Sequence, residues 1–149
     1  MSNEIVRITE RRHIVSILAI EDERLDAQVL HLRNISKVEW VQWLESMISK
    51  ENLIGMWGIL ENDKIRYYIV AMNAVMPPIS KAIMLLYQNF FGAKDSNGNN
   101  YGRVLDYIKK WGIELGANEI CAFTRYPRIM SRFGFKKENH TSVTIPIGI

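Results

Sequence analysis

The sequence predicts an α/β (α+β) fold: a mixed, mostly antiparallel central sheet of six to seven strands with helices on both faces. Three observations lead to this prediction. The length of 149 residues and the 48% share of hydrophobic residues suit one domain, residues 1–149, with a sizeable core. Long apolar, β-branched stretches separated by short turns fill the middle of the chain. Amphipathic helical patterns stand before and after these stretches, so helices are expected to cover the sheet.

The N-terminal third is predicted to hold a short strand and two helical regions. Glu4 to Ile8 favours a strand, and Ile14 to Ile20 favours a helix, although its β-branched residues also fit a buried strand. Leu25 to Leu32 has no decisive period and stays open between helix and extended chain. A capping box, Ser36 with a glutamate three residues later, opens a helix predicted over residues 36–50.

Three antiparallel strands are expected next. Leu53 to Leu60 is almost entirely apolar, the tetrad 61–64 reads as a turn, and Ile65 to Val75 continues with β-branched and aromatic residues. The run 76–78 contains two prolines and must interrupt strand pairing, because proline has no N–H to donate. Ser80 to Phe91 then forms the third strand, so a meander is predicted.

The C-terminal third is predicted to alternate helix and strand. Residues 92–100 are polar and rich in glycine and asparagine, which indicates a loop. An amphipathic helix follows from Gly102, and Gly116 ends it. After it we expect a strand at Glu119–Thr124, a single helical turn at Pro127–Arg132, and a closing strand pair from Phe135 onward that includes Val143, Ile145 and Ile147.

The composition excludes several classes of protein. A net charge of +3 is too small to indicate a phosphate-backbone binder, so no nucleic acid partner is expected. The single cysteine, Cys121, cannot form an internal disulfide, which favours a reducing compartment such as the cytoplasm. No signal peptide is expected, and no apolar run approaches the roughly 20 residues that cross a bilayer. Residues His13, His31 and His140 lack ligand-like spacing, so no metal site is expected.

Residues 97–103, with the sequence NGNNYGR, join the third strand of the meander to the long helix. Such a segment can receive an anion, because the first N–H groups of a helix have no intrahelical acceptor and the helix dipole adds positive charge. Gly98 and Gly102 leave the backbone open, and asparagine at position 100 accepts positive φ more readily than other non-glycine residues. Taken alone, the segment is equally a polar turn that only leads into a helix.

This segment resembles the acyl-CoA loop of the GNAT superfamily of N-acetyltransferases, [Q/R]-x-x-G-x-[G/A] before a Leu-rich helix. Asn97 stands at the Gln/Arg position and Asn100 at the central glycine. A second resemblance lies at residues 128–136, where a short helix runs into Gly134-Phe135 and a basic residue, as in the family's C-terminal part. The resemblance covers roughly residues 53–147 and implies a GNAT-like fold with acetyl-CoA as cosubstrate.

The resemblance also implies where acetyl-CoA would lie. The loop would hold the pyrophosphate, and the thioester would lie where the strands 80–91 and 119–124 splay apart, with a strand amide polarising its carbonyl. The implied cofactor-binding residues are Tyr87, Gln88, Asn89, Asn97, Gly98, Asn99, Asn100, Tyr101, Gly102 and Arg103.

The residues for proton transfer are harder to assign. In the family a tyrosine four residues before the glycine of "GF" protonates the leaving thiolate, and here that residue is Met130, whose thioether cannot donate a proton. Tyr126 and Ser131 are the nearby candidates, whereas Cys121 is interpreted as a small buried residue. The candidates for the base, chosen by location only, are Glu51, Glu61 and Gln88.

Two functions follow as hypotheses. The first is an acyl-CoA-dependent N-acyltransferase that transfers acetyl to an amine of a small molecule or a protein. In that fold Trp40 and Trp43 could line the acceptor pocket, although core packing is the favoured interpretation. The alternative is a catalytically inactive GNAT-fold binding or structural module, of viral or phage origin and virion-associated, which Met130 and Asn100 favour. The strand 65–75 could pair with its copy in a homodimer or a larger complex.

Overall fold

A computed structural model describes residues 4–25, 35–90, 98–124 and 127–138, together with Ile145 and Ile147. The five strands of the described part form one sheet in the order β1-β2-β3-β4-β5. Neighbours are antiparallel from β1 to β4, whereas β4 and β5 are parallel. In chain order the elements are β1 (Glu4–Arg7), α1 (Arg11–Ser16), the 3-10 turn η1 (Ile17–Ala19), α2 (Lys37–Met47), β2 (Ile54–Glu61), β3 (Lys64–Asn73), β4 (Ala82–Asn89), α3 (Gly98–Leu115), β5 (Glu119–Ala122) and α4 (Pro127–Ser131).

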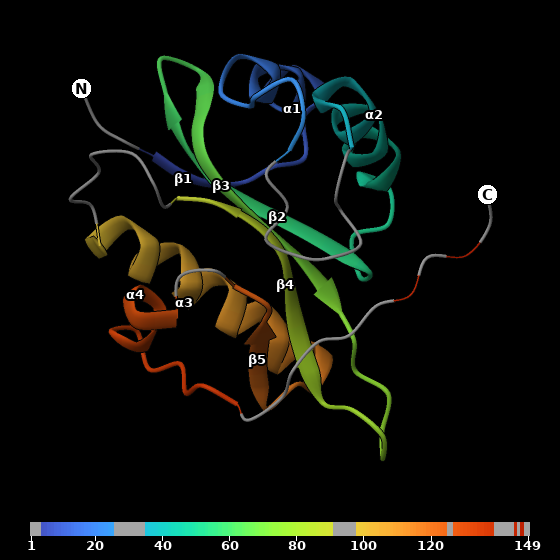
Figure 1. Ribbon diagram of the computed structural model, residues 1–149, viewed down its shortest axis with the longest axis vertical. Helices are drawn as coiled ribbons and strands as arrows, with labels where there is room; N and C mark the ends of the chain where they lie inside the picture. The colour runs from blue at the N-terminus through green and yellow to red at the C-terminus, as the bar shows by residue number, and fades with distance from the viewer. Residues whose placement is uncertain are drawn as a thin grey trace.

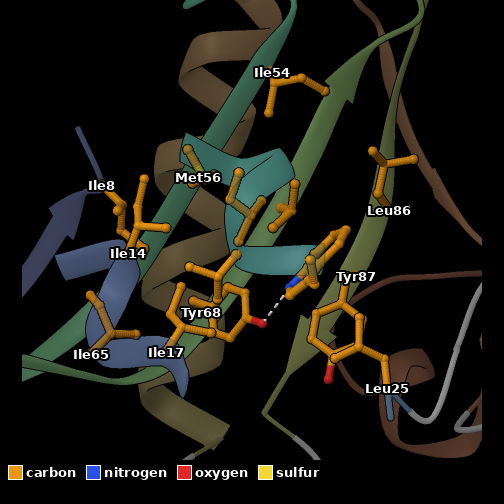
Figure 2. Packing of buried hydrophobic residues seen from close by; sticks show 14 of the residues in the cluster. Ile8, Ile14, Ile17, Leu25, Ile54, Met56, Ile65, Tyr68, Leu86 and Tyr87 are labelled. Carbon is orange, nitrogen blue, oxygen red and sulfur yellow. Dashed lines mark hydrogen bonds between the residues drawn. The ribbon is translucent and has the colours of Figure 1, made fainter. Parts of the chain in front are cut away.

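Helices cover both faces of the sheet, as the sequence predicts. The helices α1 and α2 lie on one face, and α3 and α4 lie on the other (Figure 1). Each face has its own apolar cluster. The first cluster includes Ile14, Trp40, Leu44, Met56, Tyr68, Val70, Leu86 and Tyr87 (Figure 2). The second includes Trp57, Ile69, Ile83, Leu85, Phe90, Tyr101, Val104, Ile108 and Met130.

Local signals placed both N-terminal helices correctly. The stretch 14–20 is helical, in α1 and η1, and not a strand. The helix predicted over 36–50 is α2, and the side chain of Ser36 accepts a hydrogen bond from the N–H of Glu39 at 3.1 Å, as a capping serine does. Of the undecided stretch 25–32 only Leu25 is among the described residues, and it is buried.

The predicted meander is confirmed as β2, β3 and β4. The turn between β2 and β3 has Asn62 and Asp63 in the left-handed region, with φ of 54° and 61°. Pro77 and Pro78 lie in the turn that separates β3 from β4, outside the ladder, as their missing N–H groups require. Because β3 lies between β2 and β4, its backbone is already paired. The expectation that residues 65–75 offer an edge to a second copy is therefore wrong.

Two predictions about the C-terminal half are wrong in detail. The described residues form five strands and not six to seven, since residues 135–138 have no strand structure. Phe135 is partly buried and packs against the second cluster, and Ile145 and Ile147 are 83% and 98% exposed. An apolar pattern cannot distinguish such contacts from strand pairing. Val143, also placed in the closing pair, lies outside the described residues.

The helix α3 begins at Gly98, four residues before the predicted start at Gly102. Glycine and asparagine have low helix propensity, so its first turn resembles a loop in sequence. The tertiary contact that overrides propensity is Tyr101, which is 1% exposed and packs edge-on against Phe90 at 5.4 Å and Phe133 at 4.7 Å. The helix ends as predicted, because Gly116 has φ of 91° directly after Leu115.

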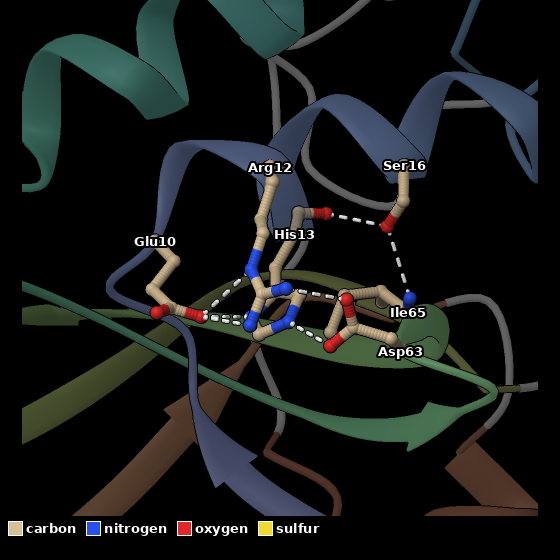
Figure 3. Close-up of polar contacts among 6 residues, drawn as sticks. All are labelled: Glu10, Arg12, His13, Ser16, Asp63 and Ile65. Carbon is tan, nitrogen blue, oxygen red and sulfur yellow. Dashed lines mark hydrogen bonds and ion pairs between the residues drawn. The ribbon is translucent and has the colours of Figure 1, made fainter.

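A polar clamp ties the β2–β3 turn to α1 (Figure 3). The carboxylate of Asp63 lies 3.0 Å from Nε2 of the buried His13 and 2.6 Å from a guanidinium nitrogen of Arg12. One turn later, Oγ of Ser16 accepts a hydrogen bond from the N–H of Ile65 at 2.9 Å. The hydrogen bond with His13, followed by the charge of Arg12, holds the pKa of Asp63 below its usual value.

We expect Asp63→Asn to lower the Tm by a few degrees at pH 7. Asparagine tolerates the left-handed backbone, so the variant removes the charge and leaves the turn. A carboxyl with a lowered folded pKa stabilises above its unfolded pKa of about 3.9, and this contribution is lost as pH falls through the folded pKa. The Tm difference between the parent protein and Asp63→Asn should therefore disappear as the pH falls through the folded pKa of Asp63. Glu61→Gln, which affects an exposed pair with Arg66 in the same hairpin, is the control and should change little.

Candidate functional site

The parallel strands β4 and β5 run together over only part of β4. Their pairing extends from Ala82 opposite Glu119 to Leu85 opposite Ala122, where β5 ends. The strand β4 continues to Asn89 and stays paired with β3. In the described part of the chain, the β5-facing edge of residues 86–89 therefore has no strand partner. The end of β4 thus extends beyond its pairing with β5.

A β-bulge lies at the point where this gap opens. Leu85 is opposite Ala71 and Tyr87 is opposite Val70, so Leu86 is the additional residue. In a regular strand residues 85 and 87 would share a face. Here Leu85 belongs to the cluster under α3, whereas Leu86 and Tyr87 both belong to the cluster under α1 and α2. The bulge thus turns the side chains of 87 and 89 toward α1 and α2, and that of 88 toward α3.

The start of α3 lies over the end of β4. The hydroxyl of Tyr101 donates a hydrogen bond to Oε1 of Gln88. The N–H groups of residues 98–100, in the first turn of the helix, have no intrahelical acceptor, and the helix dipole places partial positive charge there. Asn100 is buried, and its amide oxygen accepts from Arg103 at 3.4 Å. This helix end can therefore receive an anion close to the end of β4.

Met130 is packed against Gln88 on the same side. It is 1% exposed, and its sulfur accepts a hydrogen bond from Nε2 of Gln88 at 3.6 Å. The nearest hydroxyl in this network is that of Tyr101, and burial raises its pKa, which makes it a weaker proton donor. Ser131 is exposed and donates to the carbonyl of Arg128 at 2.7 Å, within its own helix. Tyr126 lies outside the described residues.

The half-buried Cys121 fits the interpretation of a packing residue. Burial, followed by the charge of Glu119, raises the pKa of its thiol, which disfavours the reactive thiolate. Among the described residues no group of three or more histidine, cysteine, aspartate or glutamate side chains could hold a metal ion. No described helix is both long and apolar enough to cross a membrane.

The sequence-based candidates for the base are poorly placed. Glu51 is exposed in the turn before β2, and Glu61 pairs with Arg66 at 3.3 Å at the far end of β2. No hydrogen bond or ion pair of the described residues joins either carboxylate to β4. Gln88 lies at the site, but its amide is committed to Tyr101 and Met130 and does not accept a proton near neutral pH.

The structure adds a carboxylate that sequence analysis missed, Glu21. It follows η1, is 8% exposed, and lies against the end of β4. The hydroxyl of Tyr87 donates to Oε2 at 2.5 Å, and the side-chain amide of Asn89 donates to Oε1. Tyr68 hydrogen-bonds the same carboxyl, and Trp40 Nε1 donates to the Tyr68 hydroxyl at 2.9 Å (Figure 2). The bulge is what turns both β4 side chains toward this carboxylate.

Burial dominates the electrostatics of Glu21. Desolvation raises the pKa of its carboxyl, and the hydrogen bonds from Tyr87 and Asn89 oppose this rise only in part. The neighbouring charge of Asp22 raises the pKa further. A buried carboxyl with a raised pKa beside a site is a candidate for proton transfer. Its partners are 66 and 68 residues away in sequence, so no local pattern could have indicated its burial.

Comparison with known proteins gives a likeness of fold. No protein-family model matches the sequence, and no curated protein matches it by sequence. Solved structures do match over nearly the whole chain. One is a predicted acetyltransferase from Clostridium acetobutylicum with acetyl-CoA, with a TM-score of 0.69 and 15% identity over 97% of this chain and 96% of that one.

Two further structures have assigned activities. The aminoglycoside N-acetyltransferase AAC(6')-Iy in complex with CoA has a TM-score of 0.72 and 9% identity over 97% of this chain and 95% of that one. Glucosamine-6-phosphate N-acetyltransferase from Arabidopsis thaliana has a TM-score of 0.68 and 11% identity over 97% of this chain and 99% of that one. At such identities the likeness concerns the fold alone. It confirms the predicted fold class and shows that the chain shares the fold of these acetyltransferases.

Proposed function

We propose that this chain, which has the fold of the GNAT acetyltransferases, is an acyl-CoA-dependent N-acyltransferase that transfers acetyl to an amine. The observation that carries the proposal is the end of β4 beyond the bulge at Leu86, which extends past the pairing of β4 with β5. The start of α3 lies on one face of this segment, and a buried carboxylate, Glu21, lies on the other. An anion-binding helix end and a proton acceptor on opposite faces of the same strand end suit acyl transfer from CoA to an amine.

In this proposal the cofactor lies along the start of α3 and the end of β4. The amides of residues 98–100 receive the pyrophosphate, and Arg103, which is exposed, adds positive charge. A backbone amide of the segment Tyr87 to Asn89 donates to the thioester carbonyl. The proposed cofactor-binding residues remain Tyr87, Gln88, Asn89, Asn97, Gly98, Asn99, Asn100, Tyr101, Gly102 and Arg103. Structures of this fold with CoA or acetyl-CoA bound support the assignment.

The proposed acceptor is an amine of a small molecule. Support comes from structures of the same fold, one of which holds a bisubstrate analogue that joins CoA to an acetylneamine, and another of which is named for glucosamine 6-phosphate. Both acceptors are small molecules that carry a primary amine.

Acetyl-CoA is expected to stabilise the folded protein by about 2.7 kcal/mol at 100 times its Kd. Thermal unfolding with increasing acetyl-CoA or CoA measures this effect. Gly102 provides the matched variants, because a Cβ there would meet only Phe133, at 3.6 Å, which is ordinary contact. Gly102→Ala should therefore keep the stabilisation. Gly102→Glu should lose it, since a carboxylate beside the start of α3 repels the phosphates.

The two variants separate binding from folding. Both should unfold cooperatively without ligand, with Gly102→Ala as stable as the parent protein or slightly more so, because alanine favours helix. An unchanged Tm of the parent protein at millimolar CoA would contradict the proposal.

A catalytically inactive module is the second candidate function. Met130 supports it, because the buried thioether at the position of the usual acid cannot protonate a leaving thiolate. Asn100 supports it less, since its buried side chain is turned toward Arg103. Release of CoA thiol from acetyl-CoA in the presence of primary amines distinguishes the two functions. An inactive module would bind acetyl-CoA, or another partner, with no thiol release above the rate in buffer.

A further inference from the structure

Within the part of the chain that the structure describes, Glu21 is a buried acid without a cationic partner. Its hydrogen-bond partners are the hydroxyls of Tyr87 and Tyr68 and the amide of Asn89, all of them neutral. No lysine, arginine or histidine of the described residues forms an ion pair with it. A carboxylate removed from water without an opposite charge is costly, and proteins keep such groups paired unless they serve a function. The position therefore favours a cationic ligand.

The donors around Glu21 suit its ionised form. Each carboxylate oxygen receives a hydrogen bond, one from Tyr87 and one from Asn89, and an ionised carboxylate only accepts. The same two residues belong to the free end of β4. A group held at Glu21 consequently lies one side chain away from the backbone segment proposed to hold the thioester carbonyl.

We propose that Glu21 binds the ammonium group of the acceptor and takes its proton, and that the acceptor carries a primary amine on a slender chain. This inference rests on the proposed N-acyltransferase function. It assigns the proton acceptor, which sequence analysis sought at Glu51, Glu61 and Gln88, to a residue on the opposite face of β4 from Gln88.

The proton and electron balance is complete without another reactant. The ammonium passes one proton to Glu21, and the freed lone pair forms a C–N bond to the thioester carbonyl carbon. The C–S bond then breaks, and its electron pair leaves on the sulfur of CoA. The second proton lost from nitrogen yields the amide and balances the thiolate as CoA thiol, while Glu21 returns its proton to solvent.

The surroundings of Glu21 restrict the acceptor. Only 8% of this residue is exposed, so a bulky or branched amine cannot approach its carboxylate closely. Tyr87, which donates to its carboxylate, meets Trp40 edge-on at 5.4 Å in the apolar cluster under α2. A carboxylate forms a charge-assisted hydrogen bond with an ammonium ion and gives no comparable gain to a neutral alcohol. The acceptor class is therefore a cationic primary amine with an unbranched aliphatic arm.

The pH dependence follows from the groups that face Glu21. These are Tyr87 and Asn89 on β4, Tyr68 on β3, and Asp22 on its own segment. Ammonium binding needs the carboxylate, so affinity should rise with pH through the raised pKa of Glu21. Tyr87→Phe removes a hydrogen bond that lowers this pKa, and the rise should then occur at higher pH.

The test uses n-butylamine as probe and 1-butanol and cyclohexylamine as matched controls. Binding to the CoA-saturated protein is measured by NMR titration, and acetyl transfer by release of CoA thiol. The parent protein should bind n-butylamine and not the alcohol, and should acetylate it faster than cyclohexylamine. Glu21→Gln should abolish detectable binding of n-butylamine and lower kcat/KM by about 100-fold or more.

Two comparisons keep the test decisive. Glu23→Gln is the control, because it removes a carboxylate two positions away that is 86% exposed and pairs with Lys37. It should change neither the affinity for n-butylamine nor kcat/KM by more than about two-fold. Acetyl-CoA stabilisation is measured on the same samples. Equal n-butylamine binding by the parent protein and Glu21→Gln, with acetyl-CoA stabilisation intact in both, would overturn this inference alone. If acetyl-CoA does not stabilise the parent protein, the proposed function is overturned. If Glu21→Gln does not fold, the pH dependence of n-butylamine binding to Tyr87→Phe decides. A profile that is not shifted relative to that of the parent protein would overturn the inference.

Discussion

Replacing Trp40 by alanine is expected to lower the free energy of unfolding by about 3–5 kcal/mol, the range for removal of a buried tryptophan. Trp40 is 1% exposed in α2 and belongs to the cluster between α1, α2 and the sheet. It stacks on Trp43 and meets Tyr87 edge-on. The substitution removes these contacts and leaves a cavity that the sheet cannot close, because β3 is held by β2 on one side and by β4 on the other.

The same substitution breaks a polar connection to the site. The indole N–H of Trp40 donates to the hydroxyl of Tyr68, which in turn hydrogen-bonds Glu21. Trp40→Phe separates the two effects, since it keeps an aromatic ring and loses the N–H. Its cost should be clearly smaller, with about 1 kcal/mol due to the hydrogen bond. Urea unfolding of both variants measures the difference, and equal losses would show that packing contributes little.

Local chemistry explains why much of the fold was predictable. The serine cap of α2, the left-handed turn at Asn62 and Asp63, and the glycine that ends α3 are each set by residues within a few positions of one another. The apolar runs of β2 and β3 are buried in the middle of the sheet, where continuous hydrophobicity is expected. These elements together determine the order of the meander and the faces that the helices cover.

The parts that could not be predicted depend on distant contacts. The bulge at Leu86 reverses the alternation of β4, and nothing in the run Ala82 to Asn89 identifies the additional residue. The start of α3 is set by the packing of Tyr101 on Phe90 and Phe133, against the propensity of its own first turn.

Sequence patterns could suggest only one face of the candidate site. The segment 97–103 was chosen because a helix start that can receive an anion has a local sequence pattern, and its role stays a prediction. No such pattern indicates Glu21, because Tyr87 and Asn89 reach it only through the bulge. Regular alternation would place residues 87 and 89 on the face of α3 instead.

Gly58→Val is expected to destabilise the protein by about 3 kcal/mol, the upper part of the range for overpacking. A Cβ at this position would lie 2.6 Å from the backbone carbonyl oxygen of Tyr67 and 3.2 Å from Cβ of Tyr68. The carbonyl oxygen belongs to the central strand β3, so it cannot move aside as the end of a side chain could. In an ordinary strand position valine would stabilise the protein relative to glycine. A loss of stability would therefore indicate that the backbone of β3 lies too close to Gly58 for a side chain.

The position of Gly58 links this stability effect to the proposed site. Gly58 is opposite Tyr68 in the β2–β3 register, and Tyr68 lies between Trp40 and Glu21. Valine should therefore displace Tyr68 and weaken binding of n-butylamine more than binding of acetyl-CoA, which is proposed to lie on the α3 side of β4. Gly102→Ala serves as the control, because its added methyl meets only ordinary contacts. Equal stability of Gly58→Val and the parent protein would mean that β2 and β3 do not approach as closely as the pairing of Gly58 with Tyr68 requires.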